Sequence, residues 1–393
     1  MFSSFSGTTS RSALLFMRIQ TCPALMDWLL FLVLFAVLYA AGARGFSLGQ
    51  CAWLGGIFQI AYLMASPVVG MFLSRRNARA ILIASTTACT VFGVAALLCA
   101  GFVPLMVALG LTGMACSCFF NSFQTYMRGE TEPGDLARTV SRYTLAWSCG
   151  SALGFLSSGI VYGLGIAALA ALDALVGGAI LFVLLSHRRR PHHESSADDH
   201  VEQPAAAGRP VDPVYVLVGW CLIFTAMFIQ RPVHSLFPAI CARNGITSFT
   251  ASLPLAGQML IQGGMGYVMF SLRHWLYRRT PLVILHILAG VVFLLVWRFP
   301  PFVIVSIGIS LLGIYTGFAY FSAVYYASNS LRGTFNVGVN ECLVGVGSFA
   351  GLFASEWWSR RSGTENAMFL VCGVALFVSV VLQMLLICRR KQS

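Results

Sequence analysis

Two charged residues stand inside long apolar stretches of the sequence, where a charge is costly. Arg231 lies between Gln230 and Pro232, and Glu341 follows Asn340 in a later stretch. Ionisable side chains in hydrocarbon cost several kcal/mol, and in membrane proteins they mark solute pathways, proton relays and gates. Arg231 therefore predicts a fixed positive charge for an anionic or carbonyl-bearing ligand, or a gate. The structural alternative is a side chain that reaches to the outer headgroups.

Glu341 leaves three interpretations open. As a partly buried carboxyl group it could take up and release a coupling proton. It could instead pair with an arginine and hold one end of a pathway shut. In the third interpretation it is a structural carboxylate, stabilised by the positive N-terminal end of its own helix.

Three further acidic residues lie in apolar stretches. We expect Asp27, which precedes Trp28, at the membrane interface near a helix N-terminus, where a carboxylate is favoured. Glu356, beside two tryptophans, is also expected at an interface. Asp173 stands in the middle of its stretch, and both a pairing inside its own half of the chain and a functional role fit that position.

The composition is that of an integral membrane protein. Hydrophobic residues make up 58% of the 393 residues and charged residues only 10%, whereas soluble proteins average about 25% charged. The net charge of +12 forms no basic stripe, which argues against nucleic-acid binding. The twelve cysteines show no metal-site spacing and are expected as small buried hydrophobes, so neither a metal nor a cofactor is predicted. The absence of a G-x-x-x-x-G-K-[ST] loop argues against an ATP-driven pump.

Twelve apolar runs are long enough to cross a bilayer, which takes about 20 residues. Each should be a helix, because lipid offers the backbone no hydrogen-bond partner. We predict an all-α membrane protein whose twelve transmembrane helices cover residues 24–42, 47–73, 80–100, 103–126, 139–162, 165–186, 214–240, 248–271, 280–298, 301–327, 336–358 and 366–388.

The basic residues predict how these spans are oriented. With an even number of spans and both termini inside, nineteen of the 25 Lys and Arg residues fall in cytoplasmic segments and five in outer segments, and the remaining one is Arg231. Lys and Arg are retained on the cytoplasmic side. We therefore expect both termini in the cytoplasm and the protein in the cytoplasmic (inner) membrane.

A polar, charged segment between spans 6 and 7 divides the chain into two halves. It is rich in Arg, His and Ser and contains proline, which predicts a disordered linker. Its histidines are better explained by a solvated linker than by a metal site. The predicted organisation is a cytoplasmic tail (1–23), a six-helix bundle (24–186), a cytoplasmic linker (187–213), a second six-helix bundle (214–388) and a short cytoplasmic tail (389–393).

Short segments recur at corresponding positions of the two halves. Phe120–Tyr126 at the end of span 4 parallels Tyr320–Tyr326 at the end of span 10. Small residues four apart generally allow close helix packing, and such pairs recur in spans 5 and 11 as Gly150-x-x-x-Gly154 and Gly347-x-x-x-Gly351. The sequence therefore predicts an internal duplication.

The turn between spans 2 and 3 carries a family resemblance. The residues are Gly70-x-x-x-Ser74-Arg75-x-x-x-Arg79-x-x-Leu82. They resemble the cytoplasmic loop signature of the major facilitator superfamily, G-x-L-A-D-R-x-G-R-R-x-x-L. Ser74 replaces its aspartate, Asn77 its second glycine and Ala78 one arginine. The resemblance implies two pseudo-symmetric six-helix bundles around a shared cavity.

The resemblance also implies which residues face that cavity. It places spans 1, 4, 7 and 10 around the centre, which makes polar residues of spans 4, 7 and 10 the best candidates for its lining. Gln59 and Tyr62 share one face of span 2. The predicted cavity set, whose structural alternative is helix-to-helix hydrogen bonding, is Asn121, Gln124, Arg231, Gln258, Gln262, Tyr315 and Tyr320.

The resemblance sharpens the gate interpretation of Glu341 as well. In the family, the loop after span 2 meets the start of span 11, and Ser74 has removed the acid of that loop. Glu341 would then pair with an arginine of the cytoplasmic side, and the candidates are Arg75, Arg79, Arg142 and Arg332.

We therefore interpret the sequence as a secondary active transporter that moves a small organic solute by alternating access. Proton coupling, a monomeric state and a lipid bilayer as its surroundings belong to that interpretation, and no enzymatic activity does. The alternative is a membrane sensor or scaffold that keeps the fold without transport, to which the altered loop signature gives weight.

Overall fold

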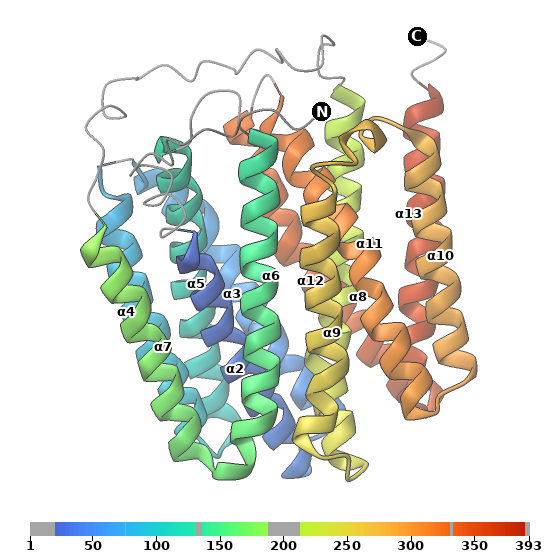
Figure 1. The fold of residues 1–393 in the computed structure, drawn as a ribbon. Coiled ribbons are helices and arrows are strands. Elements are labelled where there is room, and N and C mark those ends of the chain that lie inside the picture. The colour runs from blue at the N-terminus through green and yellow to red at the C-terminus, as the bar shows by residue number, and fades with distance from the viewer. Residues whose placement is uncertain (1–19, 75, 131–135, 188–212, 331–332, 390–393) are drawn as a thin grey trace, which may run out of the picture.

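The computed structural model describes residues 20–74, 76–130, 136–187, 213–330 and 333–389. All regular secondary structure in these residues is helical. Twelve long helices run alongside one another between two ends of the molecule (Figure 1). They are α2 (Thr21–Ala43), α3 (Leu48–Phe72), α4 (Ala78–Leu98), α5 (Phe102–Glu130), α6 (Leu136–Val161), α7 (Ile166–Ser186), α8 (Pro213–Arg243), α9 (Ser248–Val268), α10 (Arg279–Arg298), α11 (Phe302–Ser328), α12 (Gly333–Ser362) and α13 (Ala367–Arg389); short 3₁₀ turns, η1 (Tyr162–Leu164) and η3 (Arg273–Trp275), lie in two of the connections.

These helices agree with the twelve predicted spans in order and to within four residues at each end. Eleven of them are long and apolar enough to cross a membrane. The other, α9, is 21 residues long and has polar side chains, among them the fully buried Gln258 and Gln262. The prediction of an all-helical fold is thus confirmed for the described residues. Most of the predicted linker and tails lies outside them.

The same turn follows α2 and α8. Gly45 and Gly245 adopt φ values of +79° and +69°, a left-handed conformation that glycine adopts without a Cβ clash. The residue after each glycine donates its N–H to a carbonyl five positions back, which ends the helix in a Schellman motif. Ser47 and Thr247 then cap the following helices by accepting hydrogen bonds from the backbone N–H groups of Gln50 and Thr250.

Glycine pairs allow two helices in each half to pack closely. Gly150 and Gly154 of α6 lie against α2, and Gly347 and Gly351 of α12 lie against α8. A Cβ atom at any of them would meet a backbone carbonyl, namely that of Ala24, Trp28, Phe224 or Phe228, respectively. The predicted close packing is confirmed, and the contact recurs at corresponding positions of the two halves.

Helix α8 is continuous through Pro232 and Pro238. Prolines in a helix interior favour a bend or an unwound turn, but α8 does not unwind at either residue. Proline removes one hydrogen bond, and Pro232 leaves the carbonyl of Phe228 without its usual intrahelical donor. Gly351 of α12 lies against that carbonyl, so packing by a neighbouring helix supports this point of α8.

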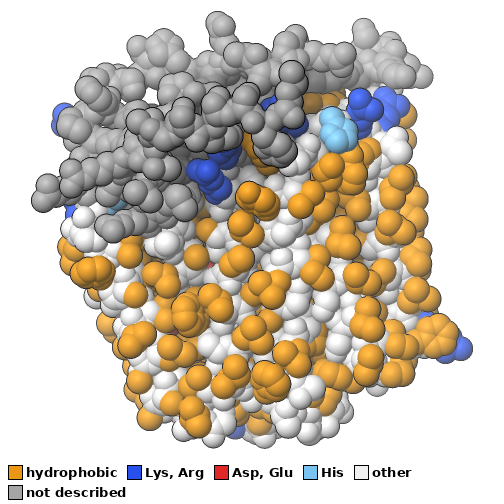
Figure 2. Space-filling model, viewed as in Figure 1, with side chains coloured by type: hydrophobic (Ala, Val, Ile, Leu, Met, Phe, Trp, Pro, Cys, Tyr) orange, Lys and Arg blue, Asp and Glu red, His pale blue; other side chains and the backbone are white. Residues whose placement is uncertain are grey.

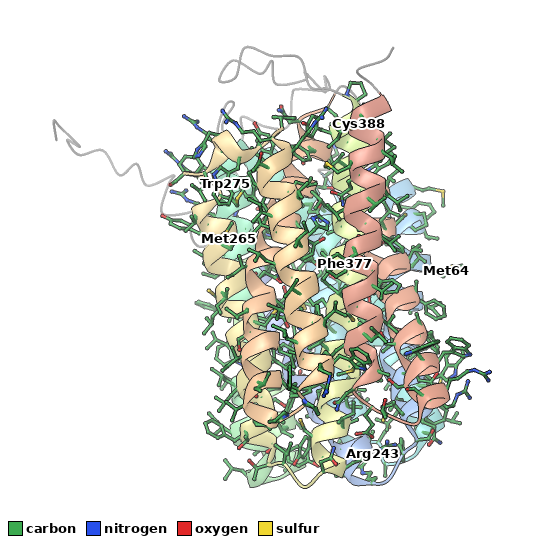
Figure 3. All side chains as sticks on the ribbon, turned by 90° about the vertical axis from the view of Figure 1, so that its right-hand side faces the viewer. Met64, Arg243, Met265, Trp275, Phe377 and Cys388 are labelled. Atoms are coloured by element: carbon green, nitrogen blue, oxygen red, sulfur yellow. The ribbon has the colours of Figure 1, made fainter. Side chains whose placement is uncertain are left out.

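The flank of the molecule is apolar. In Figure 2 hydrophobic side chains cover the surface between the two ends, and Lys and Arg gather mainly toward the end where α13 finishes. Figure 3 shows Cys388 near that end and Arg243 near the other. We refer to the end that carries Cys388 as the terminal end and to the other as the opposite end.

Helices of the first and second halves of the chain meet at three main places. α2 packs against α8, α3 against α12, and α6 against α9. Polar side chains that the sequence singles out lie along these contacts, among them Arg231 between α8 and α2, Glu341 between α12 and α3, and Gln262 between α9 and α6.

Candidate functional site

Glu341 lies at the contact between α12 and the first half of the chain. Its Oε2 accepts a hydrogen bond from the hydroxyl of Tyr62 at 2.9 Å, and its Oε1 accepts one from Nε2 of Gln124 at 3.1 Å. Tyr62 belongs to α3 and Gln124 to α5. Hydrogen bonds to a carboxylate contribute about 1.5–3 kcal/mol each. The carboxyl group of Glu341 therefore fastens three helices together.

Further polar side chains continue from this carboxyl group along α3 and α5. Ser66 and Ser117 share a hydrogen bond of 2.8 Å between their hydroxyls. Asn121 donates to the hydroxyl of Ser66 at 3.3 Å and to the carbonyl of Ser117 at 2.8 Å. The structure thus brings the predicted residues Asn121, Gln124 and Glu341 into one region. It adds Tyr62, which the sequence placed on a polar face of its span without assigning it to the site.

Arg231 is the second charged centre of the interior. Its Nε donates to the hydroxyl of Ser348 on α12 at 3.2 Å, and its guanidinium lies 6.0 Å from the ring centroid of Phe31 on α2. A cation next to an aromatic face is stabilised in an apolar interior. Arg231 therefore lies in the bundle rather than reaching outward.

Asp27 lies deeper than the sequence predicts. Its side chain is only 6% exposed and stands in the second turn of α2, which begins at Thr21. The helix starts earlier than predicted, so Asp27 lies past its first turn and faces neighbouring helices. Asp27, Arg231 and Glu341, with the polar partners named above, form what we call the central polar cluster.

A small cavity adjoins Arg231. It is lined by residues of α2, α3 and α8, among them Gln59, His234 and Ser235. Its volume is about 10 Å³, close to the least that holds one water molecule. This cavity can therefore hold a water molecule but no larger ligand.

The two glutamines of α9 serve different contacts. Gln262 accepts a hydrogen bond from Gln230 of α8 at 2.9 Å and donates to Ser148 of α6 at 3.2 Å, which links the two halves. Gln258 lies 3.0 Å from the imidazole Nε2 of His234. Both glutamines are fully buried, so the hydrogen bonds they make between helices keep α9 in place despite its lower hydropathy.

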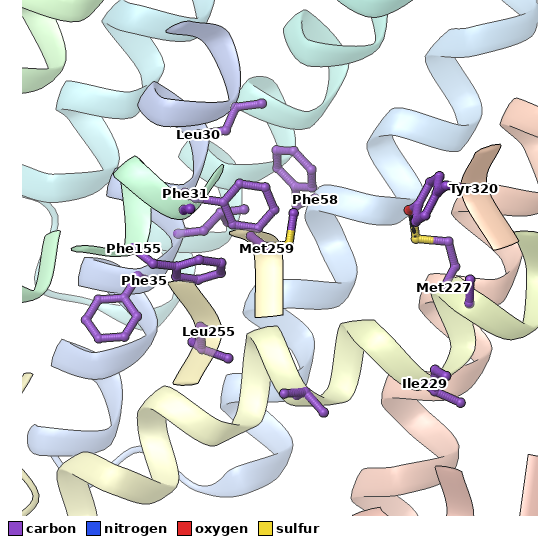
Figure 4. Close-up of a cluster of buried hydrophobic side chains, with 14 of the residues drawn as sticks. Leu30, Phe31, Phe35, Phe58, Phe155, Met227, Ile229, Leu255, Met259 and Tyr320 are labelled. Carbon is purple, nitrogen blue, oxygen red and sulfur yellow. Dashed lines mark hydrogen bonds between the residues drawn. The ribbon is translucent and has the colours of Figure 1, made fainter. Parts of the chain in front are cut away.

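The two predicted tyrosines of α11 point in different directions. Tyr320 donates its hydroxyl to the sulfur of Met227 at 3.0 Å (Figure 4). Its ring also packs edge-on against Trp147 of α6. Tyr315 instead lies 3.0 Å from His286 of α10, at a contact inside the second half. The structure therefore brings Tyr320 to the junction of the two halves and places Tyr315 away from it.

A family comparison identifies the chain. The model of the Major Facilitator Superfamily matches residues 19–351. The chain belongs to this superfamily. The crystal structure of a mutant of the nucleoside transporter NupG is similar to this facilitator, with a TM-score of 0.67 and 12% sequence identity, over 95% of this chain and 99% of the NupG chain. None of the curated protein sequences compared with the facilitator matches it.

Two residues that replace the usual ones in the loop signature of this facilitator bond to each other just before α4. Ser74 donates its N–H to the side chain of Asn77 at 2.7 Å, and the Asn77 N–H returns a bond to the Ser74 hydroxyl at 3.4 Å.

The predicted gate arginines fall in separate places. Arg79 donates to the carbonyls of Leu184 and Leu185 at 2.8 and 3.0 Å, at the negative C-terminal end of α7. Arg142 is exposed on α6. Arg75 and Arg332 lie outside the described residues. Among the described residues, the side chains that donate hydrogen bonds to Glu341 are Tyr62 and Gln124.

The opposite end of this facilitator is held by Arg243, which sequence reasoning did not select. Its guanidinium donates to the carbonyl of Phe46 in the α2–α3 turn and forms an ion pair of 3.2 Å with Glu365, in the turn before α13. Nearby, the hydroxyl of Tyr39 donates to the carbonyl of Ile246 at 2.8 Å. Turns of both halves are therefore tied together at this end.

Proposed function

We propose that this facilitator is a secondary transporter that moves a small organic solute by alternating access. The observation that carries the proposal is the position of Glu341, a carboxyl group from the second half whose hydrogen-bond donors come from the first. Charged groups in an apolar bundle are expected along a solute or proton pathway. A residue held from both halves can respond to the movement of one half against the other.

The helix contacts support two pseudo-symmetric six-helix bundles, α2–α7 and α8–α13. α3 and α9 hold corresponding positions in the two halves, as do α6 and α12. The observed contacts are α3 with α12 and α6 with α9, as expected when two equivalent bundles face each other. The two bundles also share the same turn after α2 and α8 and the same glycine contacts in α6 and α12, which supports their equivalence. Rocking of one bundle against the other would expose the central polar cluster to one side at a time.

We further propose that the terminal end faces the cytoplasm and that the protein lies in the cytoplasmic membrane. The excess of arginines in the segments at that end supports this orientation. The ties of Arg243 would then close the outer side. Both halves of the site come from one chain, so a monomer contains all that the proposal needs.

Within this scheme Arg231 binds the solute and Glu341 couples or gates its movement. The guanidinium of Arg231 suits a carboxylate, phosphate or carbonyl oxygen. Polar residues at the same junction, including Gln124, Tyr320 and Gln262, would supply further hydrogen bonds to the solute. Glu341 either carries the coupling proton or latches the cytoplasmic side shut, for which the undescribed Arg75 and Arg332 remain candidates.

The experiment that tests the proposal is solute flux in proteoliposomes. Purified protein is first screened for thermal stabilisation by metabolites, and nucleosides are included because the similar NupG is a nucleoside transporter. A solute that stabilises the protein is then offered to vesicles that contain it. We expect time-dependent uptake that Arg231→Gln abolishes and Arg231→Lys partly retains. Binding without flux would instead indicate a sensor or scaffold.

A further inference from the structure

A long apolar groove lies on the flank of the second half, away from the central polar cluster. Helices α8 and α13 supply its long walls, and α12 contributes Leu343 and Trp358. Its volume is about 780 Å³, within the range of about 300–1,000 Å³ that ligand pockets have. Several of its residues are about half exposed, among them Val374 and Val378. The groove therefore opens to the surroundings of the protein.

The dimensions of the groove fit an extended hydrocarbon chain. Its α13 wall runs from Leu370 to Leu386, which at about 1.5 Å of rise per residue is a length of about 24 Å. One leaflet accounts for half of a hydrocarbon core of about 30 Å. The groove can therefore accept an acyl chain over the full depth of one leaflet. Figure 3 shows α13 facing the viewer, with Phe377 midway along it.

The groove offers a ligand almost no free polar group. The hydroxyl of Thr225 donates to that of Ser379 at 2.7 Å, and the Ser379 hydroxyl also accepts a bond from Gln383 at 2.8 Å. These hydroxyls are already satisfied by one another. A polar ligand would lose its hydration in this groove without replacement, so the part of a ligand that lies there must be hydrocarbon.

Positive charge stands at one end of the groove. Beyond Trp358, the last turn of α12 carries Arg360 and Arg361, both exposed. Arg361 stands three residues after Trp358 and so shares its face of α12. Arg360 instead pairs with Glu356 at 3.7 Å, on the side of α12 where Glu356 lies next to Gly49 of α3. Tryptophan and arginine together mark the headgroup level of a membrane, and arginine binds phosphate oxygens in pairs.

We propose that this groove binds one acyl chain of an anionic phospholipid, whose phosphate is held by Arg361. The apolar walls account for the chain, and the arginine accounts for the charge of the headgroup. The site is separate from the solute pathway and does not depend on whether the protein transports a solute.

Photo-crosslinking tests the acyl-chain part of the proposal. Purified protein is reconstituted with phosphatidylglycerol that carries a diazirine in one acyl chain, and the adducts are mapped by mass spectrometry. We expect adducts within residues 217–228 and 370–386, and several-fold fewer with Val374→Trp, which fills the groove. Val381→Trp is the matched control, because Val381 is an exposed residue of α13 outside the groove. Equal adduct yields in the two variants, or adducts spread evenly over all exposed helices, would overturn the proposal.

A lipid comparison tests the headgroup part. We expect phosphatidylglycerol to give several-fold more adduct than phosphatidylcholine, and Arg361→Gln to remove that difference. Arg360→Gln, which removes an exposed arginine on the other side of α12, should keep it. Equal labelling by the two lipids in the unmodified protein, or displacement of phosphatidylglycerol by a neutral lipophile at equal concentration, would exclude an anionic phospholipid as the occupant.

Discussion

The hydroxyl of Tyr62 lies 2.9 Å from Oε2 of Glu341 and joins α3 to α12 across the junction of the two halves. The donor and the acceptor are 279 residues apart in the sequence. Separating α3 from α12 must break this bond. Because protonation removes the charge that strengthens it, the state of the carboxyl group and the conformation of the protein are linked.

The first prediction concerns this carboxyl group. Glu341→Gln keeps the shape of the side chain but cannot take up a proton. If Glu341 carries the coupling proton, uphill uptake driven by a pH gradient should be lost, whereas exchange of labelled for unlabelled solute should continue. Both are measured in the same proteoliposomes. Loss of exchange as well would favour a gate latch over a proton site.

Tyr62→Phe is the matched control for that experiment. It removes one donor and leaves the carboxylate in place with Gln124. A hydrogen bond to a charged group is worth about 1.5–3 kcal/mol. The rates of uptake and exchange should therefore change, while the pH dependence of uptake persists. If Tyr62→Phe abolished coupling as Glu341→Gln does, the hydrogen bond rather than the proton would be the essential feature.

A second prediction concerns the closure of the opposite end. Arg243→Gln removes the tie to Phe46 and the ion pair with Glu365. The loss of a partly exposed ion pair and hydrogen bond costs about 1 kcal/mol. The fraction of molecules that are open at this end should therefore rise several-fold. The measurement is the rate at which a maleimide modifies Cys51, which is fully buried in α3, in a variant without the other cysteines.

Arg298→Gln is the control for the closure experiment. Arg298 lies at the same end of the molecule and stacks over the ring of Phe299, next to it in the chain. Its replacement should leave the modification of Cys51 unchanged. An unchanged rate in folded Arg243→Gln would show that other contacts, such as that of Tyr39 with Ile246, suffice to keep this end shut.

The fold was predictable because its signals are local. The length of an apolar run determines each span, and glycine followed by a Ser or Thr cap determines where α3 and α9 begin. The repeated glycine pairs also predicted close packing correctly. Helix α8 shows the limit of such reasoning, because prolines favour a bend or an unwound turn, yet the helix is continuous and Gly351 packs where Pro232 removes a hydrogen bond.

The site was predictable only in part, because a sequence gives the period of a helix but not its rotation against its neighbours. Asn121, Gln124 and Glu341 were chosen as polar residues in apolar runs and lie together. Tyr315 satisfied the same criterion and faces His286 instead. The pair of Arg243 and Glu365 joins residues 122 positions apart, and no short-range pattern in the sequence indicates it.

The third prediction concerns Asp173, which is fully buried in α7 against Gly93 of α4. Neither of its carboxyl oxygens has a hydrogen-bond partner among the described residues. A buried carboxylate without a partner costs several kcal/mol. Asp173→Asn removes the charge at nearly constant shape, so the melting temperature should stay the same or rise. A fall in the melting temperature of Asp173→Asn would show that Asp173 has a stabilising partner.

The fourth prediction uses the close contact between α12 and α8. Gly351→Ala places a Cβ atom against the carbonyl of Phe228, and the backbone on either side must shift. Overpacking of this kind costs about 1–3 kcal/mol, so the melting temperature, followed by size-exclusion chromatography after heating, should fall. The control is Gly264→Ala in α9, where a Cβ atom meets nothing within 4 Å and alanine favours the helix by up to about 1 kcal/mol. Its melting temperature should not fall. A Gly351→Ala protein as stable as the unmodified one would mean that α8 and α12 can separate at this contact at little cost.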